Sequence, residues 1–197
     1  MPKQRITKEM VVAAAFEIAR KEGIEKATVK AISEKLGCSV QPIYSYCRNM
    51  DGLRQEVAEK ARGFVREYAA KHIDPNDLFR STGHAYVQIA KEEPHLFRLY
   101  LFQERKGVTS LEDIYRTETN PAVAHKIAAD LKIPVPAAKQ LHLNMLIYTI
   151  GIGTIFSVTS SSISEEEIYE QQEQAYEAFL KNAKESQGNE SGDFGSI

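Results

Sequence analysis

Apolar residues recur every three or four positions along most of this chain, and no stretch alternates apolar and polar residues as a half-buried strand does. The first such segment follows Thr7, a residue type that favours the helix N-cap, and ends at Gly23, a residue type that favours the end of a helix. Its predicted inner face consists of Val11, Ala14, Ala15, Ile18 and Ala19. The periodicity predicts an all-α fold.

Two short helices are predicted next, joined by a tight turn. Thr28 is expected to cap the first helix, which stops at Gly37 and has Val29, Ile32 and Leu36 on one face. Ser39 is expected to cap the second helix, with Val40 and Ile43 pointing inward. Pro42 is tolerated near a helix start because first-turn N–H groups have no intrahelical acceptor. This spacing is that of a helix-turn-helix unit.

The outward side chains of the second helix form hydrogen bonds and include no carboxylate. They are Gln41, Tyr44, Ser45 and Tyr46, followed by Arg48. Gln41 suits an adenine edge in a bidentate pair, while Tyr44, Ser45 and Arg48 suit phosphate oxygens. The alternative is that any helical hairpin carries some polar outward residues.

The charge distribution favours contact with nucleic acid. Residues 1–48 contain nine Lys or Arg and five Asp or Glu, a net of +4, whereas the other 149 residues carry 16 against 22, a net of −6. A basic end on an acidic body suits phosphate contact, although a chance excess of solvated lysines is the alternative.

The segment from Ile6 to Leu53 resembles the N-terminal domain of TetR-family transcriptional regulators. The matching positions are Ile6-Thr7, Ala14-Ala15, Glu22-Gly23, Thr28, Gly37-Cys38-Ser39, Ile43-Tyr44 and Leu53. The chain departs from the family at Tyr46-Cys47, often His-Phe, and at Met50, commonly Lys, which removes one expected phosphate contact.

The resemblance implies that the second helix enters the major groove and that Thr28, Gln41, Pro42, Tyr44, Ser45 and Tyr46 approach DNA. For Tyr46, packing against the next helix is the alternative. The full predicted DNA-binding set is Thr28, Lys30, Ser39, Gln41, Pro42, Tyr44, Ser45, Tyr46 and Arg48.

The rest of the chain predicts a larger helical body. Asn49 is expected to cap a helix of about 20 residues that joins the two parts. Further starts are expected at Asp74-Pro75, Asn120-Pro121 and Ser110, with a break at Glu93-Pro94. The predicted domains are 1–48 for DNA binding, 49–185 for effector binding and dimerisation, and 186–197 as a disordered tail.

The last two long helices, from about Pro136 to Ser161 and from Ser164 onward, are expected to form a homodimer interface, as in the TetR-like arrangement. The expected contact residues are Ile147, Gly151, Ile155, Ile168, Gln172, Ala175, Tyr176 and Phe179. The alternative is that these helices only close the chain's own core. A two-fold dimer would present its reading helices roughly 34 to 36 Å apart.

A small, mostly apolar effector is expected among the middle helices, where aromatic residues alternate with a few polar ones. The candidate effector-binding residues are Phe79, His84, Tyr86, Phe102, Tyr115, Asn144 and Tyr148. The alternative at each position is plain core.

No catalytic residue, cofactor or metal site is predicted. The five histidines lack the local spacing of metal ligands, and no phosphate loop or nucleophile motif occurs. Cys38 and Cys47 fit a reducing compartment, with a redox switch between them as the alternative to buried thiols. We expect no signal peptide or membrane span and a cytoplasmic protein.

These observations favour a ligand-responsive transcriptional regulator, expected to be a repressor, that binds a palindromic operator in double-stranded DNA as a homodimer. The alternative is a helical small-molecule binding protein whose head has lost operator recognition, as Met50 and the modest +4 charge allow.

Overall fold

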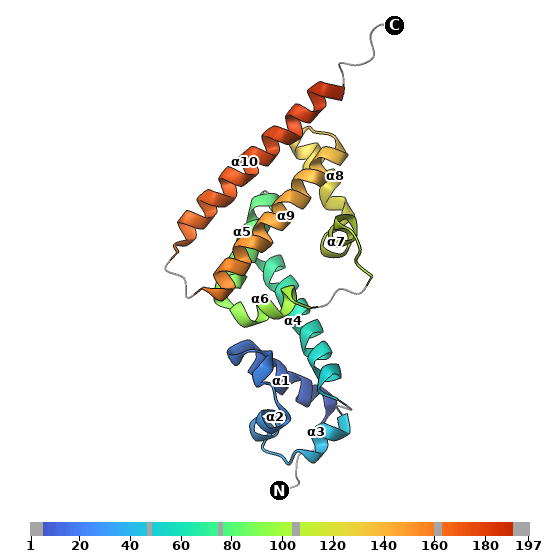
Figure 1. The fold of residues 1–197 in the computed structure, drawn as a ribbon, viewed down its shortest axis with the longest axis vertical. Helices are drawn as coiled ribbons and strands as arrows, with labels where there is room; N and C mark the ends of the chain where they lie inside the picture. The colour runs from blue at the N-terminus through green and yellow to red at the C-terminus, as the bar shows by residue number, and fades with distance from the viewer. Residues whose placement is uncertain (1–5, 47–48, 75–76, 104–106, 160–162, 191–197) are drawn as a thin grey trace.

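The computed structural model describes residues 6–46, 49–74, 77–103, 107–159 and 163–190. Within these ranges the regular elements are all helices, ten α-helices and one 3-10 turn, as the periodicity predicted. The molecule is elongated, with a small N-terminal head of α1 to α3 at one end and a larger helical body at the other (Figure 1). Helix α4 runs from the head into the body.

The head contains α1 (Lys8–Glu22), a 3-10 turn (Ile24–Lys26), α2 (Val29–Leu36) and α3 (Gln41–Tyr46). At the end of α2, Gly37 adopts a left-handed conformation with φ of 62°. Its N–H bonds the Glu34 carbonyl, and the N–H of Cys38 bonds the Ser33 carbonyl at 3.0 Å. This pair of bonds satisfies the last carbonyls of α2 and turns the chain toward α3.

Helix α3 begins one residue later than the predicted cap implies. The Val40 carbonyl accepts the first bonds, from the N–H groups of Ile43 and Tyr44, so Val40 and not Ser39 occupies the cap position. Val40 precedes the first turn and is 43% exposed, so the expectation that it points inward was wrong. Pro42 is the second residue of α3 and needs no intrahelical acceptor there.

Six other predicted N-caps are confirmed, because each side-chain oxygen accepts a bond from a first-turn backbone N–H. They are Thr7, Thr28, Asn49, Ser110, Asn120 and Ser164. One predicted start was wrong: helix α5 begins at Leu78, with Asp77 before it, and not after Asp74.

The head core is closed by residues from outside the head. Its fully buried side chains include Val11, Ile32, Ile43, Val57 and Leu96. Val57 lies on α4 (Met50–His72) and Leu96 on α6 (Pro94–Leu101), so both helices support the head. The predicted boundary after residue 48 remains a prediction, since α4 contributes to the head core and, through Val65, to the body core.

The body is built around α9 (Val135–Val158), which packs against α5 (Leu78–Glu92), α8 (Pro121–Leu131) and α10 (Glu165–Glu190). Helix α7 (Leu111–Glu118) precedes α8. Helix α10 continues to Glu190, so the backbone of residues 186–190 is helical where a disordered tail was expected; residues 191–197 lie outside the described ranges.

Helix α9 is long and apolar enough to cross a membrane by length and composition alone. In this fold it is the central helix of the body, and 39% of its most apolar stretch is buried. The length and apolar composition of α9 are therefore also those of a core helix.

Candidate DNA-binding surface and internal cavity

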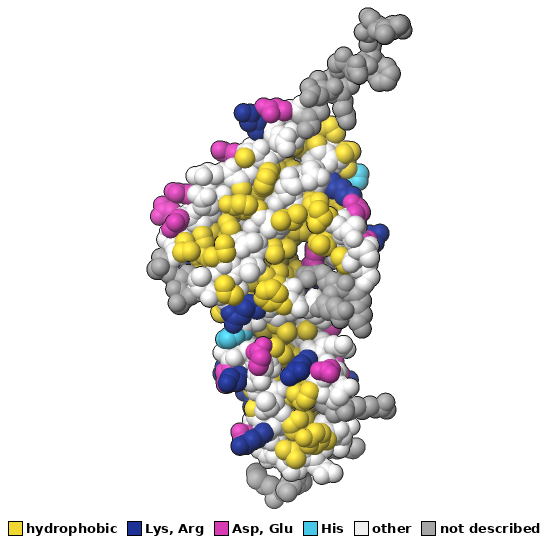
Figure 2. All heavy atoms as spheres, in the orientation of Figure 1, with side chains coloured by type: hydrophobic (Ala, Val, Ile, Leu, Met, Phe, Trp, Pro, Cys, Tyr) yellow, Lys and Arg dark blue, Asp and Glu magenta, His cyan; other side chains and the backbone are white. Residues whose placement is uncertain are grey.

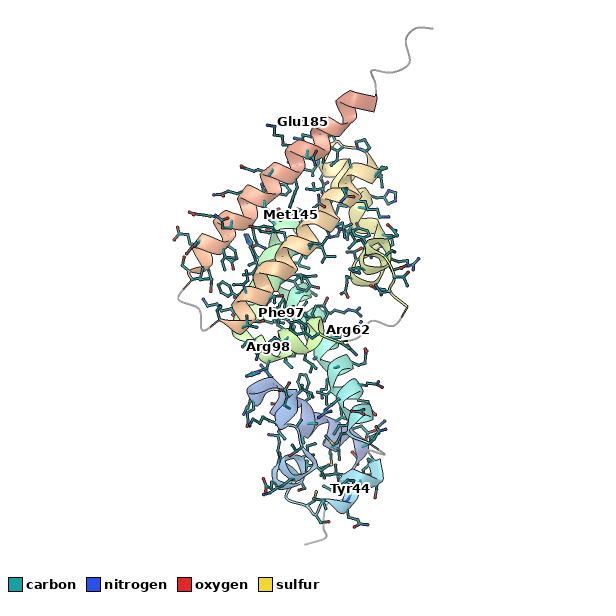
Figure 3. The ribbon with its side chains drawn as sticks, in the orientation of Figure 1. Tyr44, Arg62, Phe97, Arg98, Met145 and Glu185 are labelled. Atoms are coloured by element: carbon teal, nitrogen blue, oxygen red, sulfur yellow. The ribbon has the colours of Figure 1, made fainter. Side chains whose placement is uncertain are left out.

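The outward face of α3 lies at the end of the head farthest from the body, where Tyr44 is labelled (Figure 3). Ile43, fully buried, holds α3 against α1 and α2. The opposite side chains are exposed: Gln41, Ser45 and Tyr44, the last at 64%. An amide, a hydroxyl and a phenol thus face solvent together, which are groups that bond base edges and phosphates.

The other predicted DNA-binding residues differ in how free they are. Tyr46 donates its hydroxyl hydrogen to the Ile6 carbonyl at 2.9 Å, so it ties the end of α3 to the start of α1 instead of the next helix. Thr28 is exposed and caps α2. Lys30 is exposed, with its ammonium 3.9 Å from a Glu34 carboxylate oxygen. Ser39 is exposed, and Pro42 is half-buried. Arg48 and Cys47 lie outside the described residues.

A cavity of about 210 Å³, partly open to solvent, lies in the body between α5 and α9. Helices α6, α8 and α10 complete its walls through Phe97 and Tyr100, Ile127, and Tyr176 respectively. Phe97 lies on α6 at the end of the body nearest the head, and Met145 lies farther from the head on α9 (Figure 3); both line the cavity. The volume is below the usual range of about 300–1,000 Å³ for ligand pockets, so any ligand must be small.

Burial disfavours the charged form of two histidine rings at this cavity. Burial lowers the pKa of His142 to about 4, and its Nδ1 lies 2.9 Å from the Tyr115 hydroxyl. Burial also lowers the pKa of His84, whose ring centroid lies 4.0 Å from that of Tyr169. Arg80 and Glu173 pair with each other at 2.7 Å.

Two further sets of hydrogen-bonded polar side chains line the cavity. Tyr100 donates to a Glu118 carboxylate oxygen at 2.5 Å and is also hydrogen-bonded to Tyr86. On another wall, Gln172 of α10 donates from Nε2 to the Thr149 hydroxyl at 3.3 Å. The Gln172 Oε1 atom is buried without a hydrogen-bond partner. Buried polar groups are usually satisfied, so this carbonyl oxygen is an exception.

Three of the predicted effector residues line the cavity, namely Phe79, His84 and Tyr86. Tyr115 is buried beside it and reaches it only through His142. Three others do not line it, and their expected role in effector binding stays a prediction. Phe102 is 71% exposed next to a separate hollow between head and body. Asn144 bonds Gln140 along α9, and Tyr148 donates to the Gln171 carbonyl.

The predicted dimer residues divide into exposed and buried groups. On α9, Ile147 and Ile155 are 47% and 52% exposed, and Gly151 faces open space. On α10, Ile168, Gln172 and Tyr176 are at most 6% exposed, because they pack onto the chain's own core. These three therefore face the chain's own core, and their expected contact with a partner stays a prediction. Ala175 and Phe179 are partly buried against the same core.

No family model matches this chain. The chain is similar to an uncharacterised HTH-type transcriptional regulator, YobS, of Bacillus subtilis (strain 168), with 27% identity over 105 residues. That match covers 52% of this chain and 55% of the relative, so it spans about half of the relative's length.

A solved structure of a transcriptional regulator from Rhodococcus sp. Rha1 shares the fold. The TM-score is 0.58 over 90% of this chain and 97% of that chain, at 14% sequence identity. At this identity the likeness concerns the fold alone. The relative and the neighbour are both transcriptional regulators. The all-helical fold with an N-terminal helix-turn-helix is consistent with that class.

Several cavity residues were missed from the sequence. Thr149 and Gln172 lie on α9 and α10, for which the sequence predicts a dimer interface, and nothing in the sequence connects Glu118 and His142 with the aromatic segment. One signal existed: Thr149 and Gln172 are polar residues on otherwise apolar helix faces. Within the described ranges, no group of three His, Cys, Asp or Glu side chains could hold a metal ion.

Proposed function

We propose that this chain is a DNA-binding transcriptional regulator of the TetR type that acts as a homodimer and releases its operator when a small, mostly apolar effector enters the body cavity. The observation that carries the proposal is the exposed face of α3, where Gln41, Tyr44 and Ser45 project from a buried Ile43 anchor. Similarity to two transcriptional regulators supports the same class.

An exposed apolar strip on α9 supports a dimer. Ile147, Ile155 and Val158 are 47%, 52% and 61% exposed, and Gly151 between them allows a close approach of another backbone. Figure 2 shows hydrophobic side chains gathered along this face of the body, over α9 and α10. Such strips on soluble proteins commonly mark interfaces, and a two-fold contact through α9 would pair two heads for a palindromic site.

Helix α6 supports coupling between cavity and head, because its two faces belong to different cores. Leu96 is buried in the head core, while Phe97 and Tyr100 line the cavity. Arg20 of α1 pairs with Glu93, which directly precedes α6. Arg98 of α6 donates to the Ser157 carbonyl on α9. An effector that displaces Phe97 would therefore shift the head relative to the body.

The required energy is modest. A ligand that binds two conformations with affinities differing by about 1–3 kcal/mol changes operator affinity by roughly 5- to 150-fold. In a dimer, small rotations of both heads change the spacing between the two α3 helices, and the half-sites of DNA lie about 34–36 Å apart.

The test is selection of bound sequences from a random pool of duplex DNA, using wild type, Gln41→Ala and Tyr44→Ala at the same salt concentration. We expect a palindromic consensus from wild type. Gln41→Ala should relax one base-pair position, because a bidentate amide contact contributes about 1–3 kcal/mol of discrimination. Tyr44→Ala should weaken binding to all sequences. Gln174→Ala, an exposed α10 variant, is the control.

Absence of any enriched sequence, from folded protein at moderate salt and without effector, would overturn the regulator proposal. It would favour the helical small-molecule binding protein, since the cavity does not depend on DNA recognition.

A further inference from the structure

The Gln172 side chain lies at a wall of the body cavity and is only half satisfied. It is 4% exposed, its Nε2 donates to Thr149, and its Oε1 has no partner. Leaving a buried carbonyl oxygen unpaired costs roughly 1–3 kcal/mol. A ligand group that donates a hydrogen bond would recover that free energy.

A glycine stands beside this amide in the middle of α5. A Cβ atom at Gly83 would lie 3.4 Å from the Gln172 Nε2 and 3.7 Å from the Thr149 hydroxyl oxygen. Glycine inside a helix destabilises it by roughly 0.5–1 kcal/mol relative to alanine. Gly83 also lines the cavity, so its missing side chain leaves space next to the polar pair.

The other charged groups at the cavity wall already have hydrogen-bond or ion-pair partners within the protein. Arg80 and Glu173 form a two-pronged pair, and Glu118 accepts from Tyr100. Phe79, Phe97, Ile127 and Met145 supply apolar walls. A charged ligand would lose hydration in the cavity, and Arg80 and Glu173 are already paired with each other.

We propose that the cavity binds an uncharged, compact, mostly apolar molecule that packs into the space left by Gly83 and carries one hydroxyl or N–H group, which donates a hydrogen bond to the Gln172 Oε1 atom. This inference rests on the proposed function only in taking the cavity as the effector site. It adds the chemical class of the effector and the two residues that select it.

The test compares benzyl alcohol with its hydrocarbon isostere ethylbenzene and with the acceptor-only benzyl methyl ether. Binding to the full chain is measured by ligand-observed NMR titration without DNA. We expect wild type to prefer the alcohol over both analogues by about tenfold, which corresponds to one hydrogen bond of about 1.4 kcal/mol.

Two variants locate that preference. Gln172→Met keeps the length of the side chain and should abolish the preference, while Gln171→Met, on the exposed face of α10, should keep it. Gly83→Ala should weaken alcohol binding at least threefold yet raise the urea midpoint; Gly63→Ala, in open space on α4, should raise the midpoint without changing binding.

Equal affinities for the alcohol and ethylbenzene, a preference for the ether, or a preference that survives in Gln172→Met would each overturn the inference. Because the titration contains no DNA, its outcome is independent of the operator selection. Donor-selective binding without operator recognition would uphold the cavity chemistry and reject the regulator proposal. Operator recognition without donor-selective binding would uphold the regulator proposal and reject the cavity chemistry.

Discussion

Tyr44 and Tyr46 occupy neighbouring positions on α3 but do different work. Tyr44 is 64% exposed, whereas the Tyr46 hydroxyl binds the Ile6 carbonyl at 2.9 Å. Removing the Tyr44 hydroxyl therefore tests an expected contact with DNA, whereas removing the Tyr46 hydroxyl tests a contact that stabilises the head. The two variants are matched in size, since each loses a single oxygen atom.

We expect Tyr46→Phe to lower the free energy of unfolding by about 0.5–1 kcal/mol, the usual net contribution of one hydrogen bond. Tyr44→Phe should leave stability unchanged and lower operator affinity. Urea unfolding and fluorescence anisotropy with labelled DNA measure the two effects. A stability loss in Tyr44→Phe equal to that in Tyr46→Phe would contradict this assignment.

His142 predicts a pH dependence of stability. Its pKa is about 4 in the folded protein, because burial disfavours the charged ring, and about 6.5 when unfolded. The unfolded chain then binds the extra proton, so stability is fully present above pH 6.5 and falls as the pH drops toward 4. The loss amounts to at most about 3 kcal/mol.

Urea unfolding at pH 7.5 and pH 5 measures this loss. His142→Gln should reduce the difference between the two pH values, whereas His125→Gln, exposed on α8, should preserve the wild-type difference. An unchanged pH dependence in His142→Gln would show that other groups cause it.

Helix α9 contains two glycines with different surroundings. A Cβ at Gly153 would lie 2.6 Å from the Phe97 Cζ, whereas nothing lies within 4 Å of a Cβ at Gly151. Phe97 is fully buried, so it has little room to move. The close approach of α6 and α9 thus depends on Gly153.

Gly153→Ala should lower the free energy of unfolding by about 1–3 kcal/mol, the usual cost of overpacking a core. Gly63→Ala in α4 provides the control, since it changes the same residue type in a helix without a steric conflict and should raise stability slightly. Chemical denaturation of both variants decides between packing and helix propensity. A stabilised Gly153→Ala protein would mean that α6 and α9 can separate freely.

At the scale of the whole molecule, the described residues include a long apolar strip on α9, formed by Ile147, Ile155 and Val158. Ile155 lies within the strip, while Leu111, 56% exposed on α7, lies apart from it. A lysine at either position is compatible with the monomer fold, because both side chains already face solvent. Only one of the two should matter for association.

Ile155→Lys should weaken self-association by at least about tenfold, because an unpaired ammonium in an apolar interface costs more than 1.4 kcal/mol. Leu111→Lys should associate like wild type. Sedimentation velocity over a range of protein concentrations gives the two dissociation constants. Dimers of unchanged affinity in Ile155→Lys would place the interface elsewhere.

Local interactions explain which predictions succeeded. Thr7, Thr28 and Asn49 cap their helices through bonds to an N–H three residues away, and Gly37 ends α2 because it adopts a left-handed backbone. Such signals lie within a few residues of one another. The helical class, most helix starts and the helix-turn-helix were therefore visible in the order of residues alone.

The candidate sites were only partly predictable, because apolar residues cover more than one face of α9 and both faces suit burial. Periodicity does not say whether Ile155 or Thr149 points inward; packing against α5 and α10 decides it, leaving Ile155 exposed and Thr149 buried. The same packing turned Gln172 from an expected interface residue into a cavity residue.

The sequence by itself therefore determined the helical class, most of the helix caps and the outward α3 surface, since these follow from contacts between near neighbours. Only the tertiary structure decided the cavity, which joins Gly83, Thr149 and Gln172 from three helices far apart in the chain. It also decided that one face of α6 packs into the head core while the other lines the cavity. These features arise from the relative placement of whole helices, a result of summed packing that no local pattern contains.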